Sequence, residues 1–283
     1  MLSGCTASRP VTQLGPLPPA ALRLASYNIR YLDLTERGED HPRGLAAWAE
    51  RRQLVLAVLR HLSPDVIGFQ EMESWTGAPQ AGPPLQQNWL RDQLPDYGVA
   101  ACECATGRQS SQPIFFRTRR FAAIDQGIED LGTAPGLAGA FAGYSDLITW
   151  VRLRDRVSGS PLTVINLHLH FSDRLRRISG AEAGRSLAMA AMARGDRVVV
   201  LGDLNTLRPS RPVAMLESGG LTHVPIQGAT YHFNHGLHLF DSIDHFFLGP
   251  GLVADGSAQI LRARSGALWP SDHHPIWVDL HPA

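Results

Sequence analysis

Short apolar runs, some alternating with polar residues and some continuous, divide the chain and predict many strands with few helices. In 22–26, Leu22 and Leu24 alternate with more polar or smaller neighbours, as expected of a strand with two different faces. The run 65–71 is mostly apolar and ends in a carboxylate, so we expect a short buried strand there. Further strands are expected at 97–105, 113–116, 147–153, 162–168, 198–201, 242–248 and 276–280.

Two segments show the longer period of an amphipathic helix. In 48–62, Trp48 and Leu62 fall near one face, and the Ser-Pro pair that follows ends the helix. A second helix is expected over 181–193. The segment 76–87 is rich in Gly, Pro and Gln, and we predict a surface loop.

The strands and helices are expected to form one domain over residues 22–283, because no linker interrupts the pattern after residue 22. Many short strands and few helices indicate an α+β domain built on packed sheets. Residues 1–21 stand apart from this domain. The part 6–20 contains four prolines and is predicted to be a flexible tether.

The tether begins with a motif that resembles a lipidation signal. Leu2-Ser3-Gly4-Cys5 is similar to the end of bacterial lipoprotein signals, in which the cysteine is lipidated after cleavage. The apolar segment that should precede the cysteine is missing, so either the natural gene begins upstream or the match is chance. In the first case we expect membrane anchoring through Cys5 and a lipoprotein or periplasmic location in the bacterial envelope. In the second case we expect a cytoplasmic protein.

Charge and cysteine content narrow the function classes. The 26 basic residues are all arginine and balance 26 acidic residues. The chain therefore lacks the large excess of positive charge that is typical of proteins that bind long nucleic acids. No run of 18 apolar residues predicts a membrane-spanning helix. Cys102 and Cys104 are too close in sequence to pair without strain, so we expect both to be unpaired apolar residues.

Polar side chains that suit a metal site and acid–base chemistry recur where the predicted strands end. Rigid strand ends can direct several side chains to one point, and carboxylate and amide oxygens suit Mg²⁺ or Mn²⁺. A histidine nearby adds a candidate base. The strand-end positions hold Asn28, Glu71, Asp203, Asn205, Asp272 and His273, and to these His168 and Asp244 add a histidine and a second carboxylate.

Seven short motifs, in this order, resemble the endonuclease/exonuclease/phosphatase superfamily, and the resemblance runs from about residue 23 to residue 280. They are Tyr27-Asn28-Ile29-Arg30, Gln70-Glu71, Asn166-Leu167-His168-Leu169, Gly202-Asp203-Leu204-Asn205, Thr230-Tyr231-His232, Ser242-Ile243-Asp244 and Ser271-Asp272-His273. Each motif alone is weak, but their order and spacing together are specific. Trp48 and the pair Arg51-Arg52 look like the branch of Ccr4-type and small bacterial hydrolases.

This resemblance implies two mostly antiparallel β-sheets packed face to face and flanked by helices, a four-layer α/β/β/α sandwich. It also implies hydrolysis of phosphodiesters or phosphomonoesters with Mg²⁺ or Mn²⁺. Residue by residue, it makes Glu71 the principal metal ligand, with Asn28 and Asp272 close to the same ion.

The remaining matched residues are implied to act on water and substrate. His273 matches the catalytic histidine and Asp244 the carboxylate that orients it. Asp203 and Asn205 match the pair that positions the attacking water and stabilises the developing charge. His168 matches a contact to a phosphate oxygen.

Two further residues are candidates for substrate binding. His232, His235 and His238 recur every three residues, as in some zinc sites, but the stretch has no helical pattern, and His232 alone matches a family pocket residue. Arg177 lies in the basic stretch 174–185, which is expected to be mostly solvated. We expect Arg177 to be the arginine that contacts substrate phosphate.

A phosphate ester is anionic and resists attack by another anion, so a cation and hydrogen-bond donors must offset that charge. We therefore expect a monomeric, metal-dependent phosphoesterase whose substrate is nucleic acid, a phospholipid headgroup or a small molecule. A dinuclear metallophosphoesterase would need an early Asp-x-His and a Gly-Asn-His-Glu motif, and neither is present. A catalytically silent binding or scaffold protein of the envelope is the other alternative, although every matched position holds a competent residue.

Overall fold

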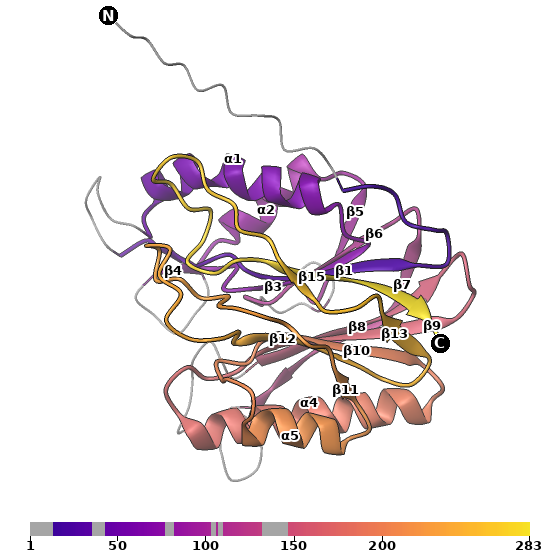
Figure 1. Ribbon diagram of the computed structural model, residues 1–283. Coiled ribbons are helices and arrows are strands. Elements are labelled where there is room, and N and C mark those ends of the chain that lie inside the picture. The colour runs from indigo at the N-terminus through magenta and orange to yellow at the C-terminus, as the bar shows by residue number, and fades with distance from the viewer. Residues whose placement is uncertain (1–13, 36–42, 77–81, 103–105, 107–109, 132–146) are drawn as a thin grey trace, which may run out of the picture.

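The computed structural model describes residues 14–35, 43–76, 82–102, 106, 110–131 and 147–283. Its elements lie in four layers, with two sheets face to face between two layers of helices (Figure 1). This is the α+β sandwich predicted above. Within the described ranges, no helix combines the length and apolar character needed to cross a membrane.

The first sheet has the order β13-β15-β1-β3-β6-β5, and β14 pairs with β15 at one side. Only β1 and β3 are parallel in this sheet, and its other pairs are antiparallel. The strands are β1 (Leu22–Asn28), β3 (Val66–Gln70), β5 (Tyr97–Ala100), β6 (Ile114–Arg117), β13 (Leu252–Ala254), β14 (Gln259–Ile260) and β15 (Ile276–Pro282).

The second sheet has the order β11-β12-β10-β9-β8-β7, and here β9 and β10 form the parallel pair. A small parallel pair, β2 (Leu32–Asp33) with β4 (Ser74–Trp75), lies outside both sheets. The strands of the second sheet are β7 (Phe121–Asp130), β8 (Leu147–Asp155), β9 (Pro161–His168), β10 (Arg197–Asp203), β11 (Thr222–His223) and β12 (Asp244–Leu248).

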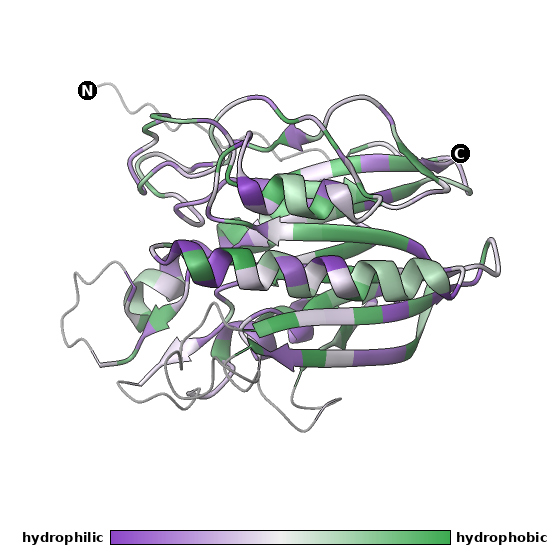
Figure 2. Cartoon of the chain, turned by 90° about the horizontal axis from the view of Figure 1, so that it is seen from below, coloured by the Kyte–Doolittle hydropathy of each residue, from purple (hydrophilic) through white to green (hydrophobic). Residues whose placement is uncertain are grey.

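Alternation along β1 explains how the layers assemble. Leu22 and Leu24 lie in the core between the sheets, whereas Ala25 and Tyr27 pack with the helix layer formed by α1 (Leu45–Leu62) and α2 (Leu85–Gln93). The second sheet packs on its outer face against α4 (Arg174–Ala193) and α5 (Arg211–Ser218). Figure 2 views the molecule from the side of α4 and α5, which carry both polar and apolar residues on this outer surface.

The structure corrects several sequence-based expectations. The predicted loop 76–87 includes the start of α2, whose nine residues are mostly polar and so lack an apolar period. α4 begins at Arg174 rather than 181, because the side chain of Asp173 accepts hydrogen bonds from two backbone N–H groups of the arginine-rich first turn. The predictions did not include α5 or β7, and β7 is an edge strand with a polar, exposed middle.

The expectations for 97–105 were also wrong in part. β5 ends at Ala100, and Ala101 has a positive φ of 53°, which interrupts an extended chain. Cys102 is disulfide-bonded rather than free. The other two cysteines of the chain lie outside the described residues, and so does the proposed lipidation site at Cys5.

Candidate active site

Strand register brings five of the predicted site residues to one edge of the sandwich. In the second sheet, parallel pairing sets His168 opposite Asp203, and antiparallel pairing sets Asp203 opposite Asp244. In the first sheet, Asn28 ends β1 and Glu71 directly follows β3. The two sheets meet here, because Nδ2 of Asn28 lies 3.1 Å from Oε1 of Glu71 and 3.2 Å from Oδ2 of Asp203.

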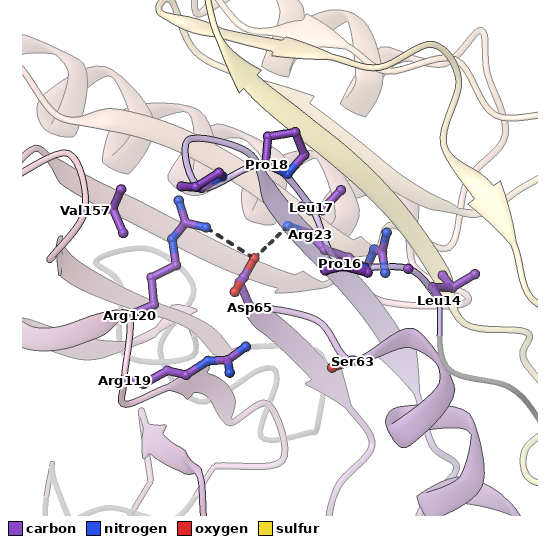
Figure 3. Close-up of a pocket in the computed structure, with 12 residues that line it drawn as sticks. Leu14, Pro16, Leu17, Pro18, Arg23, Ser63, Asp65, Arg119, Arg120 and Val157 are labelled. Atoms are coloured by element: carbon purple, nitrogen blue, oxygen red, sulfur yellow. Dashed lines mark hydrogen bonds and ion pairs between the residues drawn. The ribbon is translucent and has the colours of Figure 1, made fainter.

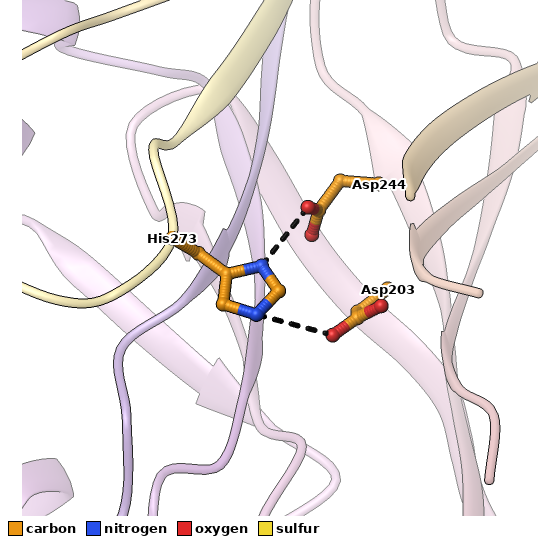
Figure 4. Close-up of side chains that lie close together, drawn as sticks. All are labelled: Asp203, Asp244 and His273. Atoms are coloured by element: carbon orange, nitrogen blue, oxygen red, sulfur yellow. Dashed lines mark hydrogen bonds and ion pairs between the residues drawn. The ribbon is translucent and has the colours of Figure 1, made fainter. Parts of the chain in front are cut away.

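His273 lies between two buried carboxylates (Figure 4). Its Nδ1 is 3.0 Å from Oδ2 of Asp244, and its Nε2 is 3.6 Å from Oδ2 of Asp203. Burial alone would lower the pKa of His273, but the carboxylates of Asp244 and Asp203 outweigh it and raise the pKa to about 10. Burial, together with the charge of Asp244, raises the pKa of Asp203 to about 6. Nε2 of His273 therefore holds a proton in the protein alone, and a cation bound nearby would have to lower this pKa before Nε2 could accept a proton from water.

The backbone around the site adopts conformations that ordinary side chains avoid. Glu71 has a φ of 55° and Asn205 a φ of 49°. Gly202 has a φ of 137°, and a Cβ there would lie 1.9 Å from the carbonyl oxygen of Leu167. Glycine is thus required for β10 to approach β9 closely enough to place Asp203 at the site.

Glu71 and Asp272 form a partly exposed acidic group, with 22% and 14% of their side-chain areas accessible to solvent. Burial, followed by the charge of Asp272, raises the pKa of Glu71. Because a cation would relieve both the repulsion and the loss of hydration, these oxygen donors fit the divalent metal that the sequence implies. Asp272 also lies 3.5 Å from the Arg30 guanidinium.

Asn28 presents its amide nitrogen, rather than its oxygen, to the carboxylates. Its Oδ1 accepts a hydrogen bond from the backbone N–H of Arg30 at 3.1 Å, while Nδ2 donates to Glu71 and Asp203. In this arrangement Asn28 holds two acidic side chains in place. Its role as a metal ligand stays a prediction.

The carboxylates of Asp203 and Asp244 and a ring nitrogen of His273 also lie within 4.8 Å of one another, as metal ligands can. However, the hydrogen bond between Asp244 and His273 occupies one ligand atom of each residue. We therefore assign this group to proton transfer and the Glu71 side of the site to the metal.

His168 completes the polar surface. Its Nε2 lies 3.9 Å from Oε1 of Glu71 and 3.8 Å from Oδ2 of Asp203. Burial lowers the pKa of His168, with the charge of Asp203 opposing that effect. A neutral imidazole at this position can donate a hydrogen bond to a phosphate oxygen.

A buried polar bridge beneath the site was not singled out by sequence reasoning. Asn166 donates to the carbonyl oxygen of Phe69 at 2.7 Å, and its Oδ1 accepts from Nε2 of Gln70 at 2.7 Å. Gln70 also donates to Ser26 at 3.1 Å. These bonds link β9 to β1 and β3 across the sheets. The only sequence signal was that Asn166 and Gln70 lie within the matched motifs.

Arg51 and Ser271 hold two loops of the site in place, the loop after β1 and the loop that carries His273. The buried guanidinium of Arg51 donates to the carbonyl oxygens of Ile29, Arg30 and Pro270 at 2.6, 2.7 and 2.9 Å. The hydroxyl of Ser271 donates to the carbonyl oxygen of Asn28 at 2.7 Å. Arg51 thus connects the loop after β1 to the loop that carries His273.

The two predicted substrate-binding side chains make no direct contact with the catalytic carboxylates, although the backbone N–H of His232 donates to the carbonyl oxygen of Asp272 at 2.8 Å. His232 is fully buried and packs against Trp269 and His274, with ring centroids 4.4 and 4.3 Å away. Arg177 donates to the carbonyl oxygens of His170 and Phe171, at 2.9 Å each, and so secures the loop after β9. Neither side chain has a contact to the catalytic group among the interactions of the described residues.

A separate cavity of about 630 Å³ lies at the opposite end of β1, beside Leu14, Arg23, Asp65, Arg119 and Arg120 (Figure 3). β1 is seven residues long, so its two ends are about 20 Å apart. The charged groups that line the cavity are largely paired, since Arg120 contacts Asp65 at 3.7 Å and the backbone N–H of Arg23 donates to the same carboxylate at 3.0 Å. This cavity is therefore not part of the catalytic group.

A family model described as the Endonuclease/Exonuclease/phosphatase family matches residues 25–273, and this range includes every catalytic residue discussed above. The chain belongs to this family. Members of the family are hydrolases that act on phosphate esters, typically with a divalent metal. No curated protein matches the chain in sequence.

Solved structures of this family share the fold. An endonuclease/exonuclease/phosphatase from Bacteroides vulgatus has a TM-score of 0.73 and 22% identity over 93% of this chain and 99% of its own. A mannosyl-6-phosphatase from Bacteroides thetaiotaomicron has a TM-score of 0.70 and 21% identity, over 92% and 99% of the two chains. The human Nocturnin catalytic domain has a TM-score of 0.64 and 18% identity, over 94% and 95%.

Proposed function

We propose that this protein is a divalent-metal-dependent phosphoesterase in which His273, paired with Asp244, activates water. The observation that carries the proposal is the buried contact of 3.0 Å between Nδ1 of His273 and Asp244, which leaves Nε2 directed toward Asp203 at 3.6 Å. A carboxylate at Nδ1 fixes the tautomer and stabilises the imidazolium that forms when Nε2 accepts a proton.

Glu71 and Asp272 would hold the metal, with Asp203 alongside. A Mg²⁺ or Mn²⁺ ion would supply positive charge that offsets the charge of the phosphate. The pKa of Glu71 is raised in the protein alone, so binding of a cation is expected to restore the ionised carboxylate.

The protein's own groups supply the other steps of hydrolysis. A water molecule attacks phosphorus and transfers its proton to Nε2 of His273, while the bond from phosphorus to the ester oxygen breaks. Asp203 lies 3.6 Å from Nε2 and would orient that water. His168 donates to a phosphate oxygen, and the backbone carbonyl of Leu169 fixes the Asn205 amide at 2.9 Å. The leaving oxygen lies on the opposite side of phosphorus, so the alcohol takes its proton from solvent, and the imidazolium afterwards returns its own proton to solvent.

Phosphate esters as a class are the substrates we propose, including nucleic acid, phospholipid headgroups and small molecules. The mannosyl-6-phosphatase among the structural neighbours shows that this fold can serve a phosphatase of sugar phosphates. A catalytically silent scaffold would have no need to retain the buried Asp244–His273 pair, because burying an unused charged pair is costly.

Hydrolysis of p-nitrophenyl phosphate and bis-p-nitrophenyl phosphate tests the proposal. With Mg²⁺ or Mn²⁺ the wild-type protein should cleave at least one of them, and EDTA should remove the activity. His273→Ala should be inactive, while His281→Ala, at a partly exposed histidine on β15, should match the wild type. Metal-independent cleavage, or full activity of His273→Ala, would refute the mechanism.

A further inference from the structure

An open pocket of about 360 Å³ lies directly beside the catalytic residues. Its wall includes Asn205, two residues after Asp203, and Ile243, the residue before Asp244. All of its lining residues are uncharged, and most of the side chains are apolar. They are Asn205, Thr206, Leu207, Pro209, Ser210, Phe240 and Ile243.

The walls of the pocket are held in place by the same elements that hold the catalytic group. The backbone N–H of Leu204 donates to the carbonyl oxygen of Ile243 at 2.9 Å. The carbonyl oxygen of Thr206 lies 2.9 Å from Nε2 of His245. The pocket is therefore fixed relative to the catalytic residues Asp203 and Asp244.

An aromatic row connects the catalytic imidazole to the pocket. The ring of Tyr231 lies 4.9 Å from that of His273, and it stacks on Phe240 with the ring centroids 6.2 Å apart. Phe233 packs against both Tyr231 and Phe240. A group that extends from the scissile phosphate over Tyr231 would thus enter an apolar environment.

The polar groups near the pocket are mostly engaged elsewhere. The Asn205 amide donates to Leu169, and Arg208, in the same loop, pairs with Glu217 at 3.2 Å. The side chain of Leu207 is 40% exposed, so a large apolar group of the protein faces water beside the catalytic site. Within the described residues, the buried Oγ of Ser210 has no hydrogen-bond partner.

We propose that this pocket binds an alkyl or aryl group esterified to the scissile phosphate, so that the protein prefers phosphate esters of apolar alcohols over those of sugars. The inference rests on the proposed function and narrows its substrate class. The hydroxyls of a sugar would lose water here and find few partners, whereas an apolar group would bury its surface against Leu207 and Phe240.

A series of primary alkyl phosphates tests the preference, because their leaving groups are chemically alike. We would measure kcat/KM with Mg²⁺ for ethyl, butyl, hexyl and 2-phenylethyl phosphate, for their methyl diesters, and for mannose 6-phosphate. We expect a rise of roughly threefold for each methylene that enters the pocket. Equal rates along the series, or a preference for mannose 6-phosphate, would overturn the inference.

Leu207→Gln links the preference to this pocket. The ratio of the kcat/KM values for hexyl and ethyl phosphate should fall by at least fivefold in this variant. Leu45→Gln, at a leucine of α1 that is 55% exposed, is the matched control and should keep the wild-type ratio. An unchanged ratio in Leu207→Gln would place the apolar site elsewhere.

Binding of alkylphosphonates, which cannot be hydrolysed, separates this inference from the proposed function. Calorimetry should show tighter binding of hexylphosphonate than ethylphosphonate, and Leu207→Gln should remove the difference. Chain-length-dependent binding without hydrolysis of any ester would contradict the proposed function alone. Hydrolysis without any dependence on chain length would contradict the pocket alone. Dioctanoyl phosphatidic acid, with and without vesicles, then distinguishes a lipid surface from a soluble ester as the source of the apolar group.

Discussion

The Nδ1 atom of His273 lies 3.0 Å from Oδ2 of Asp244, although the residues are 29 positions apart, with Asp244 at the start of β12 in the second sheet and His273 in the loop before β15 of the first. Both side chains are almost completely buried, with 6% and 2% of their areas exposed. Burying either polar group without a hydrogen-bond partner would carry a large desolvation cost. The contact is therefore both a structural connection between the sheets and the centre of the proposed proton transfer.

The two residues should act as one catalytic unit. We expect His273→Ala to lower kcat by about 10³-fold and Asp244→Asn by about 10²-fold, because the second variant retains the base but loses the charge that stabilises it. The double variant should be little worse than His273→Ala. Steady-state kinetics of the three variants measures this, and multiplicative losses would show that the residues act independently.

Glu71→Gln should remove most of the activity without unfolding the protein. The substitution preserves the shape of the side chain but removes the charge proposed to bind metal. Titration calorimetry with Mn²⁺ should show weaker binding, and circular dichroism should be unchanged. Glu129→Gln, at the opposite edge strand β7, is the control for loss of one negative charge. A folded Glu71→Gln protein that is fully active in EDTA would rule out this role.

Gly202→Ala should be among the most damaging glycine substitutions. The new Cβ would lie 1.9 Å from the Leu167 carbonyl oxygen, so β9 and β10 would have to separate. We expect a loss of about 3 kcal/mol in unfolding free energy, together with loss of activity as Asp203 moves.

Gly195→Ala separates the effect of a steric clash on stability from the effect of a positive φ. Gly195 has a positive φ of 82°, but a Cβ there meets no atom within 4 Å. Its substitution should cost about 1 kcal/mol and leave activity intact. Equal losses in urea unfolding for the two variants would contradict the steric explanation.

His223 should make the protein sensitive to mild acid. Burial, followed by the charges of His245 and Arg208, lowers the pKa of His223 to about 4 from the ordinary value of 6.5. Between these values the unfolded chain binds a proton that the folded protein does not, so stability falls as the pH is lowered from 6.5 to 4. Stability is not affected by this group above pH 6.5.

Urea unfolding at pH 7.5, 6.0 and 4.5 checks this expectation. His223→Gln should lose less stability between pH 7.5 and 4.5 than the wild type, because the neutral amide has no proton to gain. A parallel pH dependence in the two proteins would show that other groups cause the acid sensitivity.

Local pattern determined much of the fold. The alternation of Leu22 and Leu24 with Ala25 predicted the strand β1 with two different faces, because side chains alternate along any strand. The run 65–71 was recognisable because a strand buried on both faces is continuously apolar. Two of the elements that escaped prediction, α2 and β7, carry polar surfaces and so lack such a pattern.

The sequence by itself also determined the chemistry available at the strand ends, since Glu71, Asp203 and His273 are visible as polar residues in matched motifs. Only the tertiary structure decided which atoms face one another. It turned the Asn28 amide nitrogen toward the carboxylates, buried His232 behind the site, and directed Arg177 onto backbone carbonyls. The pocket beside Asn205 was likewise invisible in the sequence. These features depend on strand register and on the packing of the two sheets. Both bring together residues that are far apart in the chain, so no short repeating pattern in the sequence predicts them.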